Sequence, residues 1–395
     1  MTTSIRVLHL ISSGGFYGAE NMVIQLALAL KRMNCEVVIG VFQNAHCPNT
    51  EVAETARLHG LEVEVIECRG KLDFKTMTAI RKLISKRRFN ILHTHGYKAD
   101  IYGYGAARGT DVGLVATAHN WPGKSLSLRL YALADRIILR WFDHVCVVSS
   151  HVEAALRRFK VAHEKITVVD NGIDVGRFSE GRPVLREELG LGNNRLVGFV
   201  GRLAQEKGLE HLLHAAAGIL SVSPETKFIL VGEGPRRSKL EKLIRHLGIE
   251  KDVIFLGRRS DLADIYVSFD VLVLPSLREG MPLTVLEAMA AKRPVVATRV
   301  GAILKIVRDQ QTGLVVEAGD TTGLQSAISL LLDRPDLRRT FGQRGHEVVR
   351  TLFSSDTMAE TYLGIYRCIG CLPSKTVVPA PKPLTGIENQ DNVIG

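Results

Sequence analysis

Short apolar runs alternate with amphipathic segments along the first part of the chain. The runs predict strands at Arg6–Ile11, Glu36–Phe42, Leu61–Ile66, Ile91–Thr94, Val112–Ala118 and His144–Val148. Apolar residues at helical spacing predict helices at Asn21–Met33, Glu51–Leu58 and Thr76–Arg87, around Ala99, and at Leu128–Trp141. Strands that alternate with helices are typical of a doubly wound parallel sheet, so the fold class is α/β.

A second alternating series begins at Arg195 with LVGFVG and continues through KFILVGEG, DVIFLG, DVLVLP and PVVAT. Between the two series, residues 176–192 have only a loose pattern, and Asn171-Gly172 is a turn signal and a candidate hinge. We therefore expect two Rossmann-like domains, at 1–175 and 176–354. A last helix at 355–371 and a disordered, Pro-rich and polar tail at 372–395 complete the prediction.

The stretch LPSLREGMPLTVLEAMAAKRP, residues 274–294, joins a buried strand to a helix. Pro282 suits the first turn of that helix, because its φ is fixed and it has no N–H to leave unpaired. The backbone N–H groups of Leu283 and Thr284 then lie at a helix start, where the helix dipole favours an anion.

Glu279 and Glu287 bracket this turn with seven residues between them. One lies on the loop and the other in the helix, so both carboxylates can face a ligand at the carboxyl end of the strand and accept hydrogen bonds from its hydroxyl groups. Together with the helix start, they suggest a nucleotide sugar. The alternative is that Glu279 is a solvated loop residue and Glu287 a surface residue of the helix.

Two further loops follow strands and suit phosphate. GRLAQEKG places Arg202 and Lys207 before a helix, and a planar guanidinium and a compact ammonium together match two adjoining phosphates. SSGGFYGAEN places Gly14 and Gly15 where the backbone can approach a ligand closely. Its spacing differs from that of the dinucleotide-binding motif, so an oxidoreductase fits poorly; a plain tight turn is the alternative.

REGMPLTVLEAMAAKRPVVAT resembles the E-x7-E signature of the retaining, GT-B fold glycosyltransferases of family 4. The resemblance implies that Glu279 and Met281 contact the transferred sugar and that Glu287 binds the ribose. It also implies that Arg202 and Lys207 hold the diphosphate with the 283–284 amides, and that the backbone near Arg258 reads the base. In the first domain, it implies that the Gly14–Gly15 loop lies over the diphosphate, that His119 faces the donor sugar, and that the last helix returns to this domain.

The family pattern is broken just beyond this signature. Lys292 stands where the family usually has Gly, and GAILKIV replaces G-G-x-P-E-I-V, so that Ala302, Leu304 and Lys305 replace Gly, Pro and Glu. These departures put donor preference and full activity in question. His119 can also be a structural hydrogen-bonding residue, and Trp121 can stack on a sugar or simply pack.

The remaining features limit the other possibilities. The chain has 395 residues, a net charge of +10 and no apolar run long enough to span a bilayer, so we expect a cytoplasmic protein.

The basic cluster Arg81, Lys82, Lys86, Arg87 and Arg88 contains no acid and could bind the inner face of an anionic membrane, or be only a solvated helix face. Without interleaved aromatic residues, it does not favour nucleic acid. Cys368 and Cys371 lack the second pair that a zinc site needs.

The expected reaction is metal-independent transfer of a sugar from a UDP- or GDP-sugar to an acceptor hydroxyl, without any other cofactor. No Asp-x-Asp or His cluster is evident in the sequence to hold a metal ion. The acceptor is expected to be a cell-envelope saccharide or a glycolipid. The alternatives are an epimerase or phosphorylase of the same fold, or a catalytically silent nucleotide-sugar-binding protein.

Overall fold

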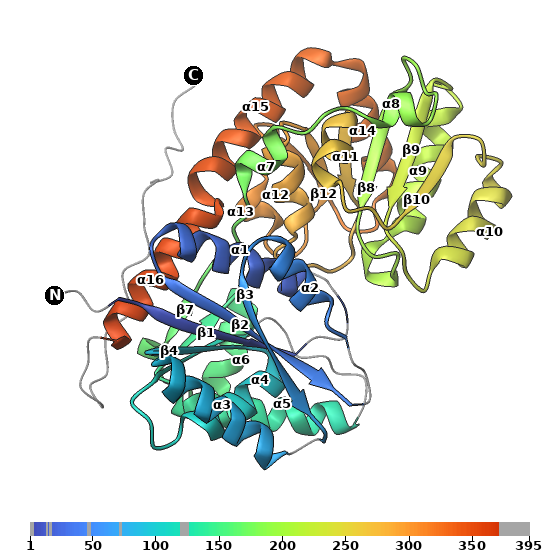
Figure 1. Ribbon diagram of the computed structural model, residues 1–395. Coiled ribbons are helices and arrows are strands. Elements are labelled where there is room, and N and C mark those ends of the chain that lie inside the picture. Colours follow the sequence, from blue (N-terminus) through green and yellow to red (C-terminus); the bar gives the residue numbers. More distant parts are fainter. Residues whose placement is uncertain are drawn as a thin grey trace. The chain divides into compact units, whose positions relative to one another are not determined.

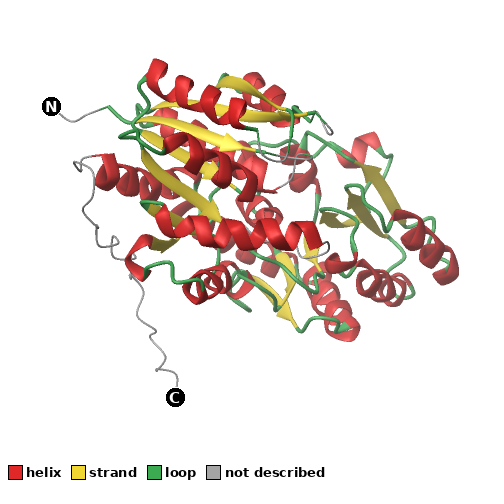
Figure 2. Ribbon diagram, turned by 90° about the horizontal axis from the view of Figure 1, so that it is seen from below, coloured by secondary structure: helices red, strands yellow, loops and turns green. Residues whose placement is uncertain are grey.

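The computed structural model describes residues 4–12, 15, 18–45, 49–70, 73–118 and 126–370. The chain divides into two compact units: unit 1 is Met1–Val169 with Ala359–Gly395, and unit 2 is Asp170–Met358. In each unit, helices cover both faces of a parallel sheet (Figures 1 and 2). The expected α/β class is therefore correct for both units.

Unit 1 contains a seven-stranded sheet in the order β3-β2-β1-β4-β5-β6-β7. Its strands are β1 Arg6–Ile11, β2 Glu36–Asn44, β3 Glu62–Cys68, β4 Ile91–His95, β5 Gly113–Ala118, β6 His144–Val147 and β7 Ile166–Val168. Its helices are α1 Gly18–Arg32, α2 Glu51–Leu58, α3 Phe74–Arg87, α4 Tyr97–Ala107, α5 Leu126–Ile138 and α6 Ser150–Arg158, together with most of α16 Ser355–Gly370.

Helix α16 is last in the sequence but completes the core of unit 1. Its Tyr366 hydroxyl lies 2.6 Å from Nδ1 of His93 on β4, and its Tyr362 hydroxyl lies 2.9 Å from Oγ1 of Thr117 on β5. Both tyrosine side chains are buried. The opposite face of the sheet packs an apolar cluster that includes Leu92. The strands are therefore covered on both sides, which explains their nearly continuous apolar runs.

Unit 2 contains a six-stranded sheet in the order β10-β9-β8-β11-β12-β13. Its strands are β8 Arg195–Val200, β9 Thr226–Val231, β10 Val253–Gly257, β11 Val271–Leu274, β12 Val295–Thr298 and β13 Gly313–Val316. Its helices are α7 Val175–Ser179, α8 Leu185–Glu188, α9 Leu209–Leu220, α10 Arg237–Leu247, α11 Leu262–Ser268, α12 Leu283–Ala290, α13 Ile303–Ile306, α14 Thr321–Asp333 and α15 Pro335–Leu352.

Several boundaries differ from those predicted. Helix α1 begins at Gly18 rather than Asn21, and β2 and β4 extend to Asn44 and His95. The loosely patterned residues 176–192 include α8 and all but the first residue of α7, and Phe178 and Leu185 of these helices are buried in the core of unit 2. No described helix has both the length and the apolar character needed to cross a membrane. The predicted tail at 372–395 lies outside the described residues.

The predicted hinge lies against the segment by which the chain leaves unit 2. Ile173 and Ser354 form a parallel bridge, and the N–H of Ser355 donates to the carbonyl of Ile173 at 2.7 Å. A Cβ on Gly172 would lie 2.3 Å from the carbonyl oxygen of Ser354. Only glycine permits this approach, so Gly172 is first of all a packing requirement.

Two buried carboxyl groups meet between α4 and α5. Asp100 is buried, accepts a hydrogen bond from the Thr94 hydroxyl and shares a hydrogen bond with Asp135. Burial, followed by the charge and hydrogen bond of Asp135, raises the pKa of Asp100 well above its usual value. Folding therefore favours the protonated form of Asp100, and stability falls as the pH rises from the unfolded pKa toward the folded one.

We predict that Asp100→Asn stabilises the protein at neutral pH. The amide keeps the acceptor for Thr94 and the donor for Asp135, but it cannot ionise in the unfolded chain. Denaturant unfolding at pH 5 and pH 8 measures the free energy of unfolding of the wild type and the variant. Relative to the wild type, the variant should gain stability at pH 8 more than at pH 5. An equal difference at the two pH values would contradict the assignment.

Candidate functional site

Two predicted donor residues of unit 2, Lys207 and Glu279, follow strands at the point where the strand order of its sheet reverses. The chain runs outward from β8 to β10 and then returns to place β11 on the other side of β8. The loops after β8 and β11 therefore leave adjacent strands, and they carry Lys207 and Glu279. Open α/β sheets bind ligands in the crevice that forms at such a switch point.

Lys207 and Glu279 meet directly. The Nζ atom of Lys207 lies 2.6 Å from Oε1 of Glu279, and their side chains are 18% and 10% exposed. The same oxygen accepts the hydroxyl proton of Ser276 at 2.6 Å. Glu279 is therefore an anchored carboxylate, and the alternative of a solvated loop residue is wrong.

The two loops are also joined through their backbones. The N–H groups of Leu277 and Arg278 both donate to the carbonyl of Glu206, at 2.8 and 3.3 Å. Gly208 follows Lys207 with φ +62°, and a Cβ there would lie 2.1 Å from the carbonyl oxygen of Pro275. The position of the Lys207 ammonium thus depends on a glycine that allows the close approach of the loops.

Helix α12 begins where the sequence predicts, with one difference. Pro282 is the N-cap residue rather than the first helical residue, and Leu283 opens the helix. Among the described residues, none forms a hydrogen bond with the buried hydroxyl of Thr284. The side-chain amide of Asn171 donates to the carbonyl of Met281 at 3.4 Å, which ties down the turn before the helix.

Glu287 is 3% exposed, so the alternative of a surface residue is wrong here as well. Its Oε2 accepts the hydroxyl proton of Tyr266 at 2.6 Å. Burial raises the pKa of Glu287, although the Tyr266 hydrogen bond and the charge of Arg177 act in the opposite direction. In this structure Glu279 contacts Lys207, whereas Glu287 contacts Tyr266, so the two carboxylates have separate partners.

Arg202 and Arg258 lie on the neighbouring loops. Arg202 is half exposed and lies 4.0 Å from Glu206, and Arg258 is exposed after β10. The loop after β9 is hydrogen-bonded to the loop after β8 and to the last residue of β10: Leu203 N–H donates to Glu233 O at 2.9 Å, and Gly232 N–H donates to Gly257 O at 2.7 Å. These bonds align three strand ends along one edge.

Gly14, His119 and Trp121 lie outside the described residues, and Gly15 is described only as a buried bend. Sequence reasoning missed three buried histidines in unit 1, His9, His93 and His95, whose ring nitrogens lie within 4.8 Å of one another. Histidines are common zinc ligands.

Four of the ring nitrogens in this cluster have hydrogen-bond partners in this structure. His9 Nδ1 lies 3.0 Å from His95 Nε2, and both nitrogens of His93 lie within 2.7 Å of hydroxyl oxygens. Burial lowers the pKa of His9 to about 3, so its ring is neutral. The cluster thus forms a hydrogen-bonded connection between β1, β4 and α16. Its H-x-H pattern on β4 is the signal that could have revealed it.

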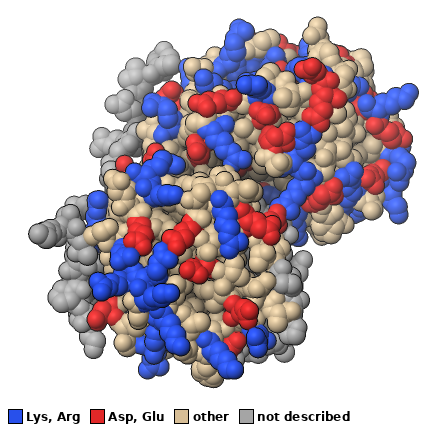
Figure 3. Space-filling view, viewed as in Figure 1, with Lys and Arg blue, Asp and Glu red and all other residues tan. Residues whose placement is uncertain are grey.

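The basic cluster around α3 is not free of acidic partners. Arg87 binds both oxygens of Glu62, at 2.6 and 2.7 Å, and the guanidinium of Arg81 donates to backbone carbonyls of residues 105, 106 and 108. Figure 3 shows acidic side chains among the basic ones on this face of unit 1. Lys82, Lys86 and Arg88 are exposed. The five residues are therefore not one uniform positive patch.

The departures from the family pattern have structural consequences. Lys292 has φ +57°, a conformation that glycine adopts more readily. The Lys305 ammonium lies 2.6 Å from Asp170, so a glutamate there would face a like charge. The backbone of Ala302 donates to the Gly280 carbonyl at 2.9 Å, which supports the loop that carries Glu279.

Comparisons with known proteins agree with these observations. A model of the family Glycosyltransferase Family 4 matches residues 16–177, and a model of Glycosyl transferases group 1 matches residues 181–348. A D-inositol 3-phosphate glycosyltransferase of Actinosynnema mirum is 31% identical, over 90% of this chain and 93% of its own. A UDP-Gal:alpha-D-GlcNAc-diphosphoundecaprenol alpha-1,3-galactosyltransferase of Escherichia coli is 29% identical, over 66% and 71%.

A solved structure has the same fold. The Anabaena protein HepE, solved in complex with UDP, superposes with a TM-score of 0.78 at 23% identity, covering 91% of this chain and 99% of its own. The same protein has also been solved with UDP-glucose. At this identity the likeness establishes the fold, which is GT-B: two Rossmann-like α/β domains.

We predict that Gly208→Ala lowers both stability and any activity that depends on Lys207. Gly190→Ala is the matched control, because Gly190 has the same φ of +62° but a Cβ added there would have nothing within 4 Å. The control should lose about 1–2 kcal/mol from backbone strain alone, and Gly208→Ala should lose more. Denaturant unfolding compares them; equal losses would contradict the proposed close approach.

Lys292→Gly should raise the free energy of unfolding by up to about 1 kcal/mol, because it relieves the left-handed backbone strain. Lys292→Ala removes the same charge but keeps a Cβ, and it should give no such gain. Thermal unfolding of the two variants separates the effect of the backbone conformation on stability from the effect of the lysine charge. If both variants gain equally, the lysine charge rather than the backbone conformation is responsible.

Proposed function

Because the chain belongs to the group 1 glycosyltransferases of family 4, we propose that it transfers a sugar from a UDP-sugar to an acceptor hydroxyl with retention of anomeric configuration. The bond from the anomeric carbon to the diphosphate breaks as the acceptor oxygen bonds to the same face of the sugar. The acceptor proton passes to an oxygen of the leaving diphosphate. This balances the reaction without a separate base.

The observation that carries the proposal is the contact between Lys207 and Glu279 at the switch point of unit 2. It joins residues from two loops at 2.6 Å, beside the start of α12. An ammonium there can stabilise the negative charge that develops on a leaving diphosphate. A preorganised donor of this kind typically contributes about 2.7–4 kcal/mol to the transition state.

The other predicted donor-site residues would contact the rest of the diphosphate, the sugar and the nucleoside. Arg202 is exposed enough to reach a diphosphate oxygen, and the backbone N–H groups of Leu283 and Thr284 lie in the first turn of α12. We propose that Glu279 and Met281 contact the transferred sugar, that Glu287 binds the ribose and that Arg258 lies near the base. In unit 1, Gly14, Gly15 and His119 remain the predicted donor-binding residues.

The choice of donor and acceptor rests on the relatives. The E. coli relative is named for UDP-Gal and a diphosphoundecaprenol-linked acceptor, and HepE has been solved with UDP and with UDP-glucose. By analogy we propose a UDP-sugar donor and an acceptor from cell-envelope synthesis. Contact with an anionic membrane would then rest on Lys82, Lys86 and Arg88.

Product analysis separates this proposal from the alternatives. Incubation of UDP-sugars with and without acceptors distinguishes transfer from epimerisation, and added phosphate tests for a phosphorylase. Binding of UDP-sugar without turnover on any acceptor would identify a silent binding protein. Proton NMR of the product reports the anomeric configuration, and assays in EDTA test metal independence.

We predict that Lys207→Ala reduces kcat by roughly 100- to 1000-fold, because a charge-stabilising donor is lost from the transition state. Steady-state release of UDP from a UDP-sugar measures kcat, and circular dichroism verifies that the variant is folded.

Lys227→Ala is the matched control. Lys227 is also 18% exposed and pairs with a carboxylate, Asp252, at 2.5 Å. This pair joins the starts of β9 and β10, the ends opposite the predicted site. The control should keep near wild-type turnover; if Lys207→Ala does so as well, Lys207 has no role in the reaction.

A further inference from the structure

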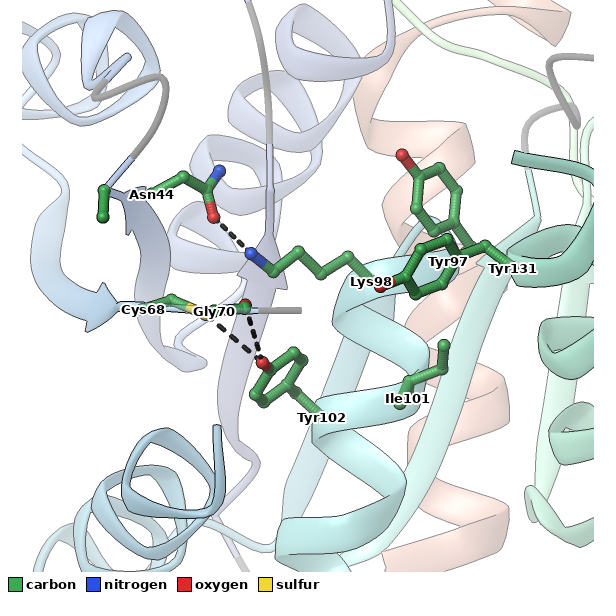
Figure 4. Close-up of a pocket in the computed structure, with 9 residues that line it drawn as sticks. Asn44, Cys68, Gly70, Tyr97, Lys98, Ile101, Tyr102 and Tyr131 are labelled. Carbon is green, nitrogen blue, oxygen red and sulfur yellow. Dashed lines mark hydrogen bonds between the residues drawn. The ribbon is translucent and has the colours of Figure 1, made fainter. Parts of the chain in front are cut away.

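Lys98 of unit 1 shows how neutral groups meet the charge of a single partly buried cation. Its ammonium donates to Oδ1 of Asn44 and lies 5.6 Å from the ring centroid of Tyr102 and 5.7 Å from that of Phe42. Figure 4 shows the lysine side chain reaching from α4 to Asn44 at the end of β2. An amide oxygen and two ring faces are favourable partners for one ammonium, so the charge of Lys98 is met within unit 1.

In unit 2, by contrast, three half-buried arginines share one carboxylate among the described residues. The Nη2 atom of Arg186 lies 2.9 Å from Oδ2 of Asp270, and that of Arg338 lies 3.9 Å from Oδ1. Arg293 interacts electrostatically with the same carboxylate and donates to the carbonyl of Phe269 at 3.3 Å. We refer to Arg186, Arg293, Arg338 and Asp270 as the arginine cluster. It holds three positive charges and one negative charge.

This excess of positive charge is not typical of unit 2. Three other arginines each have two carboxylates within 3.4 Å: Arg195 has Glu225 and Asp333, Arg237 has Glu233 and Glu241, and Arg259 has Glu188 and Asp261. These arginines are therefore fully compensated by side chains, whereas the arginine cluster is not.

Backbone carbonyls fix the guanidinium groups of the cluster but offset only part of their charge. Nε of Arg293 donates to the carbonyl of Ala291, just past α12, at 3.0 Å. Nη1 of Arg338 donates to the carbonyls of Leu331 and Leu332, in the last turn of α14, at 2.7 and 2.6 Å. The end of each helix carries roughly half a unit of negative charge, and the start of α15, where Arg338 lies, carries roughly half a positive unit. More than one positive unit therefore remains without a counter-charge from the described residues.

Two guanidinium nitrogens in the cluster keep their donors. The 3.9 Å between Arg338 and Asp270 is longer than a hydrogen bond. Arg293 donates to described residues through Nε and Nη1, which leaves its Nη2 without an acceptor among them. Burial lowers the pKa of Arg293; the charge of Asp270 acts in the opposite direction, and the charge of Arg186 lowers the pKa again. An anion beside these donors would favour the charged form.

The arginine cluster lies at the amino ends of strands. Asp270 directly precedes β11, Arg293 lies two residues before β12, and the N–H of Leu196 near the start of β8 donates to Oδ2 of Asp270 at 2.8 Å. The loops with the predicted diphosphate residues Arg202 and Lys207 follow the opposite end of β8. The cluster is therefore separate from the predicted donor site.

We propose that the arginine cluster binds a phosphate group through the free N–H groups of Arg293 and Arg338, with Arg186 held beside them by Asp270. Planar guanidinium groups match phosphate oxygens, and a dianion meets the excess charge better than a single carboxylate does. The ligand is inorganic phosphate or a small phosphorylated molecule. This site goes beyond the proposed transferase function and does not depend on it.

Inorganic phosphate is the probe. Isothermal titration calorimetry of the full-length protein, at constant ionic strength and in saturating UDP, measures its affinity while UDP occupies the predicted donor site. The wild type should bind phosphate, and Arg293→Gln and Arg338→Gln should each weaken binding by about 10- to 100-fold through loss of a charged hydrogen bond. Circular dichroism verifies folding, and the second variant keeps the test valid if the first does not fold.

Arg195→Gln is the matched control. It removes a guanidinium from the same end of β8, and its side chain is 34% exposed, as compared with 32% for Arg186. Because two carboxylates already compensate Arg195, this variant should bind phosphate nearly as the wild type does. The proposal is overturned if the wild type binds no phosphate, if the cluster variants bind it as the control does, or if acetate competes with phosphate at equal concentration.

Glycerol 3-phosphate distinguishes the two sources of the phosphate group. Tighter binding of this ester than of inorganic phosphate supports a phosphorylated molecule as the ligand, and the reverse order supports free phosphate.

UDP binding should be the same in the wild type and all three variants, because none of them changes a predicted donor residue. If UDP does not bind to the wild type, the proposed function is contradicted, but the difference in phosphate affinity between the wild type and Arg293→Gln still tests the arginine cluster.

Discussion

The candidate donor site depends on the contact between one ammonium and one carboxylate at the switch point of unit 2. Lys207 and Glu279 come from loops 72 positions apart, and their 2.6 Å contact requires both loops to hold one geometry. That geometry comes from the backbone: Glu206 accepts two N–H groups of the other loop, and Gly208 allows the approach to Pro275. Since neither side chain is well exposed, the pair is less screened by solvent than a surface ion pair.

A feature of this structure can be predicted from the sequence when the residues that determine it are close together in the chain. The strands and helices follow from the apolar pattern, and the start of α12 follows from Pro282 and the residues after it. The separation of Glu279 and Glu287 does not, because the partner of Glu287 is Tyr266, on a different helix. The role of Arg87 was missed for the same reason, since its acidic partner Glu62 lies on β3 and is distant in the sequence.

Local conformation also explains what the departures from the family pattern mean. In the sequence, a lysine in place of glycine at position 292 is an added charge near the donor site. In the structure its main property is a left-handed backbone at the end of α12. The backbone conformation cannot be inferred from this lysine itself, because lysine rarely adopts it; the family's glycine was the signal. Lys305 is different, since its charge has a definite partner in Asp170.

The pairing of charges bears on how a diphosphate could be held. Lys207 and Glu279 together are neutral, so the pair attracts an anion only if the ammonium turns part of its hydrogen bonding toward the phosphate while Glu279 keeps its bond from Ser276. The remaining negative charge must then be met by Arg202 and by the first turn of α12, whose partial charge is roughly half a unit. Glu279 would thus place the ammonium rather than neutralise it, and would remain beside the transferred sugar as an oriented hydrogen-bond acceptor. A carboxylate anchored by two donors is suited to both tasks, which gives a physical reason for an acid in a site that we propose binds an anion.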